Sequence, residues 1–340
     1  MDNRANLRDV VPDLSDEQCE LFKDVDYALK RAEEEMEFCE KHKIQVLTPN
    51  DAAYPYRLKS CPDAPIALYY RGTADLNAPH IVCIIGTRKC TVYGQDLIHR
   101  FVKELKAECP DALIVSGLAY GVDIHAHRSA LENEMETIGV VAHGLDMIYP
   151  SLHRETAKRM VGQGGLLTEY PKASRIDKRN FLQRNRIVAG LSDACILPES
   201  AIHGGGLVTC RLSVEYGREV FAFPGPVNAE YSAGCNKLIR NHQAQLITCA
   251  RDFVESMGWQ NDAILDEARK AGIELPLFPD LNLTPVEQQI VGALKANGDL
   301  HPDQIAAFSG LSINDVNSSL FMMEMNGIVR QLSGTIYHLI

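Results

Sequence analysis

The sequence lacks the cysteine spacing and the long apolar runs that would place it among zinc-finger, redox or membrane proteins. Its ten cysteines are scattered, and no two form the Cys-x-x-Cys pair that metal ligation and disulfide exchange usually use. No apolar run approaches the ~20 residues that a membrane-spanning helix requires. Residues 1–26 are rich in acids and lack the apolar core of a secretory signal. We therefore expect a cytoplasmic protein with no metal, no cofactor and no membrane partner, whose cysteines are mostly buried and reduced.

The charge is unevenly distributed, and basic residues gather in one short segment. The formal net charge is −11, yet residues 1–40 hold 13 acids and 5 bases and residues 280–340 hold 6 acids and 2 bases, so the centre of the chain is near neutral. Within that centre, residues 172–186 hold six bases and one acid, Asp177. Because salt screens charges beyond a Debye length of ~8 Å, such a segment can bind phosphates although the whole protein is acidic. A solvated surface run is the alternative interpretation.

The first 282 residues divide into three parts by pattern. Residues 1–48 form an acidic segment that we expect to be helical, and residues 261–282 form an expected linker. Residues 49–260 begin with a connector rich in proline and tyrosine and continue with short apolar runs separated by helix-length segments. The runs are residues 81–85, 113–115, 137–142, 194–197 and 220–223. This pattern predicts a Rossmann-like α/β domain, in which helices cover both faces of a mostly parallel sheet and ligands lie beyond the carboxyl ends of the strands.

Residues 283–340 follow a different pattern. Thr284, Pro285 and Glu287 combine a capping box with a proline in the first turn, which predicts the start of a helix. Apolar residues at helical spacing predict three helices near residues 285–297, 301–308 and 312–325. Residues 327–339 predict a short hairpin. Three helices followed by a hairpin are typical of a small winged-helix domain.

Two glycine-containing turns follow the first two predicted strands. Gly86, Thr87 and Arg88 follow the first run, where a glycine lets backbone N–H groups approach a phosphate and an arginine adds a forked donor that matches its oxygens. Ser116 and Gly117 begin the second turn, at the carboxyl end of the second strand. Each turn alone is also compatible with a purely structural role.

An Asp–His pair continues the second turn. Asp123 and His127 lie four residues apart, which places them on the same face of the helix that should follow. A paired carboxylate and imidazole suggest acid–base chemistry. A hydrogen bond that orients the turn is the alternative interpretation.

The basic segment leads into a candidate nucleic-acid-binding helix. It contains Lys178, Phe181, Arg184, Asn185 and Arg186. A ring among cations suits single strands, because a base stacks on the ring while the cations hold phosphates, and such stacking is typically worth ~1–3 kcal/mol per base. A phenylalanine near the start of a helix is also a common core residue, so the surrounding charge is what favours function.

Two further glycine-rich turns complete the candidate set. Gly205 and Gly206 belong to a run of three glycines at a strand-to-helix junction, which exposes a row of backbone donors able to bind an anion. Asn236 and Lys237 follow Gly234 in the last turn, and Lys237 adds a positive charge that we expect near the same edge of the sheet.

Taken together, these motifs resemble the DprA (DNA-processing, Smf) family over roughly residues 49–255. Five segments occur in the order and spacing of that family, and the winged helix resembles its usual appendage. The segments are residues 86–88, 116–127, 181–191, 223–225 and 234–239. The resemblance implies sequence-independent binding and protection of single-stranded DNA by a homodimer that loads the RecA recombinase during natural transformation. It implies no catalytic activity.

The resemblance also implies roles for particular residues. Arg88 should grip the DNA backbone, and Lys237 should lie near the pocket. The expected pocket residues are Lys178, Phe181, Arg184 and Asn185. The family usually has Gly-Ala after the segment Leu238–Ile239, in a neighbourhood that helps form its dimer and RecA surface, whereas here residues 242–244 are His-Gln-Ala. The acidity of the winged helix favours a protein-contact or regulatory role over duplex binding.

Two other functions stay open. The glycines before Thr209 are similar to the Pro-Gly-Gly-x-Gly-Thr-x-x-Glu motif of lysine-decarboxylase-like phosphoribohydrolases, but the Pro-Gly-Gly start is missing and Glu215 lies at a different spacing. The chain could instead be a structural adaptor that docks through its winged helix. Release of a base from a nucleoside monophosphate would favour the hydrolase. A DNA affinity that is the same in Arg88→Ala as in the wild type would favour the adaptor.

Overall fold

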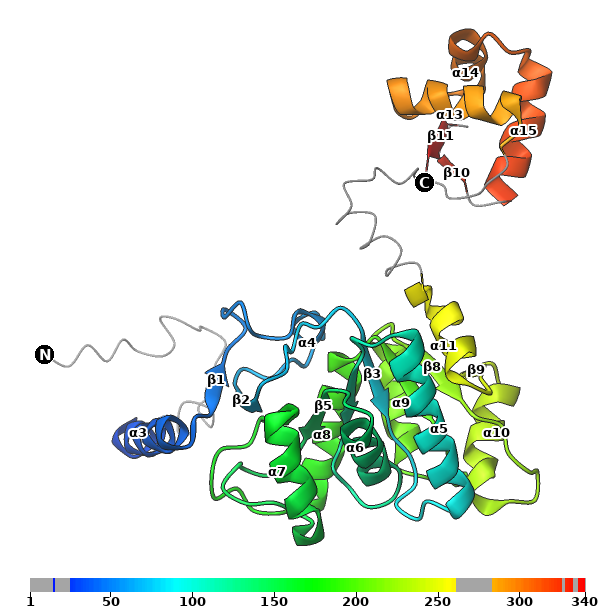
Figure 1. Cartoon of the computed structure of the whole chain (residues 1–340). Helices are drawn as coiled ribbons and strands as arrows, with labels where there is room; N and C mark the ends of the chain where they lie inside the picture. The colour runs from blue at the N-terminus through cyan, green and yellow to red at the C-terminus, as the bar shows by residue number, and fades with distance from the viewer. Residues whose placement is uncertain (1–14, 16–24, 261–282, 326–327, 333–335, 340) are drawn as a thin grey trace, which may run out of the picture. The chain divides into compact units, whose positions relative to one another are not determined.

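The chain folds as two compact units, Met1–Ile264 and Leu265–Ile340, each with its own apolar core (Figure 1). The computed structural model describes residue 15 and residues 25–260, 283–325, 328–332 and 336–339. Most of the expected N-terminal helical segment before residue 25, and the expected linker at 261–282, lie outside the described residues. Within the described ranges, no helix is both long and apolar enough to span a membrane.

A mixed sheet forms the centre of the first unit, with nine strands among the residues described. Their order is β1-β2-β6-β5-β4-β3-β7-β8-β9, in which the strands from β6 to β9 pair in parallel, whereas β2 is antiparallel to both β6 and β1. The strands are β1 (Gln45–Leu47), β2 (Leu68–Gly72), β3 (Ile81–Ile84), β4 (Leu113–Ser116), β5 (Thr137–Val140), β6 (Gly164–Thr168), β7 (Ala194–Leu197), β8 (Glu219–Ala222) and β9 (Gln245–Leu246). The predicted mostly parallel, Rossmann-like sheet is confirmed.

Helices cover both faces of this sheet, which explains why its central strands β3, β4, β5 and β7 are buried at every position. The helices on one face are α5 (Val92–Glu108), α6 (Val122–Glu132) and α11 (Ala250–Met257). Those on the other are α4 (Tyr56–Lys59), α8 (Lys178–Leu191), α9 (Gly206–Glu215) and α10 (Ala233–Arg240). In β3, Val82 and Ile84 pack in the core under α5, α6 and α11, whereas Ile81 and Cys83 pack in the core under the helices of the opposite face. A strand that is buried on both sides reads as a continuous apolar run.

Three smaller elements complete the first unit. Helix α7 (Arg154–Gly162) packs against β6 and α6, and two short 3-10 helices are η1 (Ser151–His153) and η2 (Glu230–Ser232). Tyr149 and Pro150, just before η1, are joined by a cis peptide bond.

Four strands lie outside the predicted set, for physical reasons that differ. Strand β6 begins with Gly164 and Gly165, and only two of its five residues are strongly apolar. Strands β1 and β2 form an antiparallel extension at one edge, and β2 lies within the segment that was expected to be a connector. Strand β9 has two residues, both exposed, so it has no hydrophobic signature.

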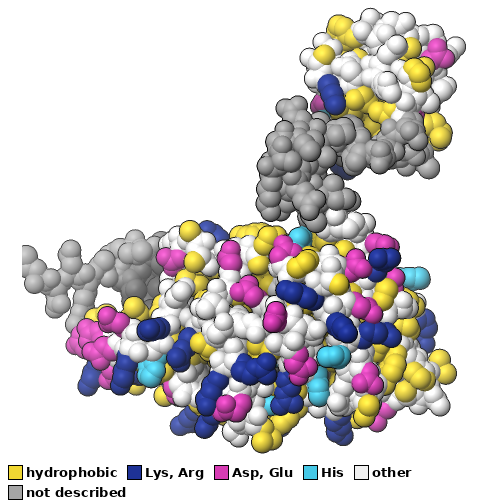
Figure 2. Space-filling model, viewed as in Figure 1, with side chains coloured by type: hydrophobic (Ala, Val, Ile, Leu, Met, Phe, Trp, Pro, Cys, Tyr) yellow, Lys and Arg dark blue, Asp and Glu magenta, His cyan; other side chains and the backbone are white. Residues whose placement is uncertain are grey.

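Helix α3 (Val25–His42) carries the acidic N-terminal pattern, and acidic side chains gather over it (Figure 2). The buried Glu35 carboxylate accepts hydrogen bonds from the backbone N–H of Lys172 at 3.0 and 3.1 Å. Lys172 Nζ in turn donates to the carbonyl of Glu34 at 2.6 Å. Helix α3 is therefore bound to the beginning of the basic segment.

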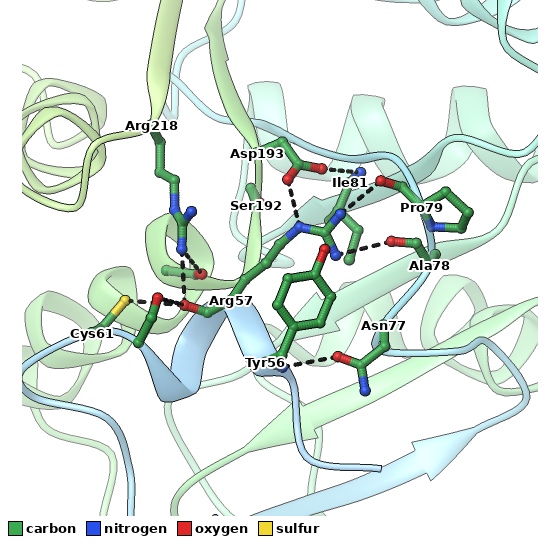
Figure 3. A network of polar contacts seen from close by, with 12 residues as sticks. Tyr56, Arg57, Cys61, Asn77, Ala78, Pro79, Ile81, Ser192, Asp193 and Arg218 are labelled. Atoms are coloured by element: carbon green, nitrogen blue, oxygen red, sulfur yellow. Dashed lines mark hydrogen bonds and ion pairs between the residues drawn. The ribbon is translucent and has the colours of Figure 1, made fainter. Parts of the chain in front are cut away.

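Buried Arg57 fixes α4 to the amino-terminal edge of the sheet (Figure 3). Its guanidinium pairs with Asp193, which precedes β7. It also donates to the carbonyl oxygens of Ala78 and Pro79 at 2.9 and 2.7 Å. Asp193 accepts a further hydrogen bond from the backbone N–H of Ile81 at 2.8 Å. Because a buried charge is costly without a partner, this network holds the connector before β3 in one position.

The second unit is a winged helix, as predicted. Its elements are α13 (Pro285–Asn297), α14 (Pro302–Ser309), α15 (Ile313–Met325), β10 (Val329–Leu332) and β11 (Ile336–Leu339). The Thr284 hydroxyl accepts from the backbone N–H of Glu287, whose carboxylate accepts from the backbone N–H of Thr284, so the predicted capping box is present. Ile290, Ile305 and Leu320 bring the three helices into one core.

Candidate nucleic-acid interface

Two adjoining hollows lie beyond the carboxyl ends of the central strands. The sheet adds β4, β5 and β6 on one side of β3 and β7, β8 and β9 on the other, so the crevice next to β3 is the topological switch point where such folds bind ligands. We name the first hollow, of about 430 Å³, the switch-point cleft. We name the second, of about 470 Å³, the aromatic pocket. The residues that line both are Arg88, Gly117, Ala119, Phe181 and Leu182.

Helix α8 forms one wall of both hollows. The Asp177 carboxylate caps it by accepting from the backbone N–H of Arg179 at 2.7 Å. Lys178, Phe181 and Asn185 follow at spacings of three and four residues, which aligns them on one face of the helix. Lys178 lines the aromatic pocket, Asn185 lines the switch-point cleft, and Phe181 lies between them.

Arg88 and Phe181 meet where the two hollows join. The guanidinium carbon of Arg88, an exposed residue, lies 5.7 Å from the centroid of the Phe181 ring. The Phe181 ring in turn lies 5.9 Å from the ring of Tyr149. An arginine over an aromatic face is attracted to the ring electrons and keeps donors for an anion. A base and its phosphate could therefore contact neighbouring groups here.

A close approach between two turns fixes the position of Arg88. The backbone N–H of Thr87 donates to the carbonyl of Glu199 at 2.9 Å, and the carbonyl of Thr87 accepts from the backbone N–H of Val122 at 3.1 Å. Gly121 has a φ of +77°, and a Cβ there would lie 2.1 Å from the oxygen of Thr87. Only glycine fits both the conformation and the space, so Gly121 sets the turn that carries Arg88.

Arg184 lines the switch-point cleft but is 4% exposed. Its Nη1 donates to the carbonyl of Gly117 at 2.6 Å and to the carbonyl of Val140. The buried Asp123 carboxylate accepts from the backbone N–H groups of Gly117 and Ala119 at 3.1 and 3.4 Å. Burial raises the pKa of Asp123 and lowers the pKa of Arg184, while each charge favours ionisation of the other. Arg184 and Asp123 thus order the turn after β4.

The Asp–His pair has separate partners in the structure. The His127 ring is fully buried in α6, and its Nδ1 lies 2.7 Å from the Thr137 hydroxyl. That hydroxyl donates its proton to the carbonyl of Ile114 at 3.0 Å, so His127 Nδ1–H is the donor. Burial lowers the pKa of His127 to about 3. The geometry favours the structural interpretation of this pair.

The glycine run forms the opposite wall of the switch-point cleft. Gly206 is the first residue of α9 and Gly205 is its N-cap residue. A Cβ on Gly206 would lie 3.0 Å from the Cα of Gly86, so the turns after β7 and β3 are packed closely. The backbone N–H groups of Leu207 and Val208 donate to the carbonyls of Gly204 and Gly205 at 3.2 and 3.1 Å. The positive end of the α9 dipole lies in this wall, which favours an anion.

Four of the predicted site residues lie outside both hollows. Ser116 is buried and donates to the carbonyl of Ile84 at 2.6 Å. Arg186 pairs with Glu169 through two hydrogen bonds of 2.6 and 3.0 Å. Asn236 Nδ2 donates to the carbonyl of Gly225 at 2.9 Å, and its Oδ1 accepts from the backbone N–H of the same glycine at 3.2 Å. Lys237 lines a separate cleft beside α9 and β9. The predicted residues that the structure brings together are Gly86, Thr87, Arg88, Gly117, Lys178, Phe181, Arg184, Asn185, Gly205 and Gly206.

Several exposed groups of the site were not predicted. Tyr120 and Tyr149 line the aromatic pocket and are 44% and 43% exposed. Lys89 lines the switch-point cleft next to Arg88. Tyr120 lies inside a turn that the sequence had marked for its glycines, and Tyr149 lies in the loop after the third predicted strand. An aromatic residue in a loop beyond a buried parallel strand is the signal that could have found both.

The cations outnumber the exposed acids around the two hollows. Arg88, Lys89 and Lys178 are exposed there, whereas Glu230 is the exposed acid among the residues that line them. The remaining acid, Asp123, is buried. The rim therefore carries a positive potential that attracts an anionic chain.

The first unit is a doubly wound α/β domain with a cationic, aromatic cleft at its switch point, and the second unit is a winged helix. Cations beside exposed rings are typical of sites that bind single-stranded nucleic acid. A family model described as DNA recombination-mediator protein A matches residues 45–258, and one for the DprA winged helix domain matches residues 276–335. The chain belongs to the DNA recombination-mediator protein A family.

Relatives and solved structures agree with this assignment. The putative DNA processing protein DprA of Mycobacterium tuberculosis is 34% identical over 319 residues, which is 90% of this chain and 80% of that protein. The crystal structure of DNA processing protein A from Streptococcus pneumoniae matches with a TM-score of 0.60 at 35% identity. The match covers 64% of this chain and 76% of the Streptococcus pneumoniae chain. The structure of DNA processing protein A from Helicobacter pylori, described for its unique single-stranded DNA binding mode, matches with a TM-score of 0.56 at 33% identity. The match covers 63% of this chain and 95% of the Helicobacter pylori chain.

Proposed function

We propose that this protein binds single-stranded DNA without sequence preference and protects it, as a mediator of recombination and not as an enzyme. The observation that carries the proposal is the convergence of Arg88, Lys178 and Phe181 on adjoining hollows beyond the carboxyl ends of the strands. Cations and backbone N–H groups bind phosphates, and rings stack on any base, so these groups give affinity with little sequence information. The single-stranded DNA binding described for the Helicobacter pylori relative supports the same role.

The finer parts of the proposal concern partners. We propose that the chain forms a homodimer and helps load RecA onto DNA taken up in natural transformation. A third cleft, of about 1000 Å³, lies between α9, α10 and β9 and is lined by partly exposed apolar side chains. Val214 and Leu246 in it are 55% and 51% exposed. Exposed apolar groups in one place favour a protein contact, and Leu246→Glu should shift the sedimentation of a dimer toward that of a monomer.

The phosphoribohydrolase alternative is weaker. Its motif needs an acid close to the glycine turn, but Glu215 lies at the far end of α9 and lines the third cleft. The acid that is buried in the switch-point cleft, Asp123, accepts hydrogen bonds from two backbone N–H groups. These hydrogen bonds give Asp123 a structural role in the turn.

Binding of labelled oligonucleotides to the full chain tests the proposed function. Fluorescence anisotropy at low salt should give saturable binding of single strands of mixed sequence and of oligo-dT with similar affinities, and weaker binding of a duplex. No base should be released from a nucleoside monophosphate under the same conditions. Failure to bind single strands at low salt, or measurable base release, would contradict the proposal.

A further inference from the structure

Three side chains with metal-binding atoms meet at the amino-terminal edge of the sheet, opposite the clefts. His80 immediately precedes β3, Cys109 is the C-cap residue of α5, and Asp111 lies in the turn that leads into β4. The backbone N–H of Leu113 donates to the carbonyl of His80 at 2.8 Å, which ties the start of β4 to the residue before β3. The fold therefore brings together residues about 30 positions apart in the sequence.

The three ligand atoms form a nearly equilateral triangle. His80 Nδ1 lies 3.4 Å from Asp111 Oδ1 and 3.4 Å from Cys109 Sγ, and Cys109 Sγ lies 3.3 Å from Asp111 Oδ1. Atoms that bind one tetrahedral zinc ion at about 2.0–2.3 Å are separated by about 3.3–3.7 Å. An ion placed at such distances from all three atoms would lie just off their plane.

The arrangement differs from that of a catalytic Cys–His–carboxylate triad. In a triad the cysteine and the carboxylate contact opposite nitrogens of the imidazole, so that one orients the ring while the other reacts. Here Cys109 Sγ and the Asp111 carboxylate both approach Nδ1 of His80. Three atoms directed at one point suit a central cation, and a thiolate, an imidazole and a carboxylate are the donor types that zinc takes.

The surroundings favour an ion that reaches the cluster from solvent. His80 and Cys109 are buried, whereas the Asp111 side chain is 58% exposed. The His80 ring packs against Trp259, with the ring centroids 4.6 Å apart. The C-terminal end of α5 is the negative end of its dipole and favours a cation. Lys106, a positive charge nearby, directs its Nζ to the carbonyls of Pro110 and Glu134.

We propose that His80 Nδ1, Cys109 Sγ and Asp111 Oδ1 form a binding site for a zinc-type divalent cation. Binding displaces the proton of the Cys109 thiol to solvent as the sulfur becomes a thiolate ligand. The bound ion links the start of β3 to the turn between α5 and β4. The site has a single cysteine and lacks the Cys-x-x-Cys spacing, so the sequence alone does not indicate it. The proposal does not depend on the proposed DNA binding.

Titration of the reduced full chain with Co²⁺, after chelation and removal of the chelator, tests the proposal. Thiolate-bound Co²⁺ adds a charge-transfer band in the near ultraviolet, and it should quench Trp259, the single tryptophan of the chain. We expect both signals to saturate at one equivalent and to be reversed by Zn²⁺. Absence of a saturable band in the wild type would overturn the proposal.

Variants assign the signal to the site. Cys109→Ser should abolish the band, and Asp111→Asn, whose side chain is largely exposed, should weaken Co²⁺ binding at least about tenfold with the circular dichroism spectrum unchanged. The control is Cys249→Ser, a partly exposed cysteine that caps α11, which should bind as the wild type does. Equal binding by Asp111→Asn and the wild type, or loss of the band in Cys249→Ser alone, would contradict the proposal.

Discussion

Two arginines of the same cleft have different roles because their burial differs. Arg88 is exposed and lies over an aromatic ring, so its donors can reach a ligand. Arg184 is buried and donates to backbone carbonyls that end β4 and β5. The sequence marks both as cationic residues of the candidate site and cannot separate a ligand-binding guanidinium from one that supports a turn.

Phe181 should contribute to DNA affinity through its ring. Phe181→Leu keeps an apolar side chain of similar length but removes the stacking surface, so single-stranded DNA should bind about 1–3 kcal/mol more weakly, which is about 5- to 150-fold. The matched control is Phe308→Leu, an exposed phenylalanine of the winged helix. Fluorescence anisotropy of a labelled oligonucleotide measures the difference. Equal losses in the two variants would mean that the Phe181 ring has no specific role.

His127 should make the stability of the first unit depend on pH. Its pKa is lowered to about 3 by burial, whereas the unfolded chain takes up the proton near the ordinary value of 6.5. The unfolded state therefore binds more protons between these values, and the free energy of unfolding should fall as the pH is lowered from about 6.5 toward 3, by up to about 1.4 kcal/mol per pH unit.

The variant His127→Asn isolates this contribution. Asparagine keeps a donor toward the Thr137 hydroxyl but has no titratable ring. Urea unfolding at several pH values should give a slope that is smaller by about one proton than that of the wild type. A variant with the wild-type slope would exclude His127 as the source.

At the scale of elements, Arg57 holds helix α4 and the connector that follows it. Arg57→Met removes the buried guanidinium and leaves the Asp193 carboxylate with one fewer partner, so the first unit should lose about 3–5 kcal/mol of stability. Thermal unfolding followed by circular dichroism measures the loss. Lys158→Ala, which breaks an exposed pair with Glu155, should change stability by less than about 1 kcal/mol. Similar unfolding temperatures for the two variants would contradict this role of Arg57.

The sequence predicted the elements whose signal is local. Continuous apolar runs marked β3, β4, β5, β7 and β8 because both of their faces are buried, and the capping box marked α13. The antiparallel edge formed by β1 and β2 depends on pairing with β6, a contact between distant segments that no local pattern reports.

The same distinction applies to the candidate site. The turns after β3, β4 and β7 and the face of α8 could be predicted, because parallel strands bring their carboxyl ends together. The sequence could not predict that Arg186 lies outside both hollows. Its partner Glu169 follows β6, a strand that the sequence pattern did not indicate. The place of Tyr149 depends on the loop after β5, whose path is set by tertiary packing.

For the whole molecule, the separation of charge is the main feature. Acids gather on α3 and in residues 280–340, where they outnumber the bases six to two, whereas the exposed cations of the site lie around the two hollows. An anionic chain is repelled by the acidic surfaces and attracted by the cationic rim. The excess of acids in residues 280–340 weakens the attraction of the winged helix for the phosphates of duplex DNA.

The central claim is that Arg88 binds the phosphate backbone of single-stranded DNA at this rim. The measurement that tests it most directly is the salt dependence of oligonucleotide affinity for the wild type, for Arg88→Ala and for the control Arg100→Ala, an exposed arginine of α5. We predict that Arg88→Ala binds about tenfold more weakly at low salt and that its plot of log affinity against log salt is shallower by about 0.7, the contribution of one phosphate contact on a single strand. The control should match the wild type. An Arg88→Ala protein with the affinity and slope of the wild type would contradict the claim.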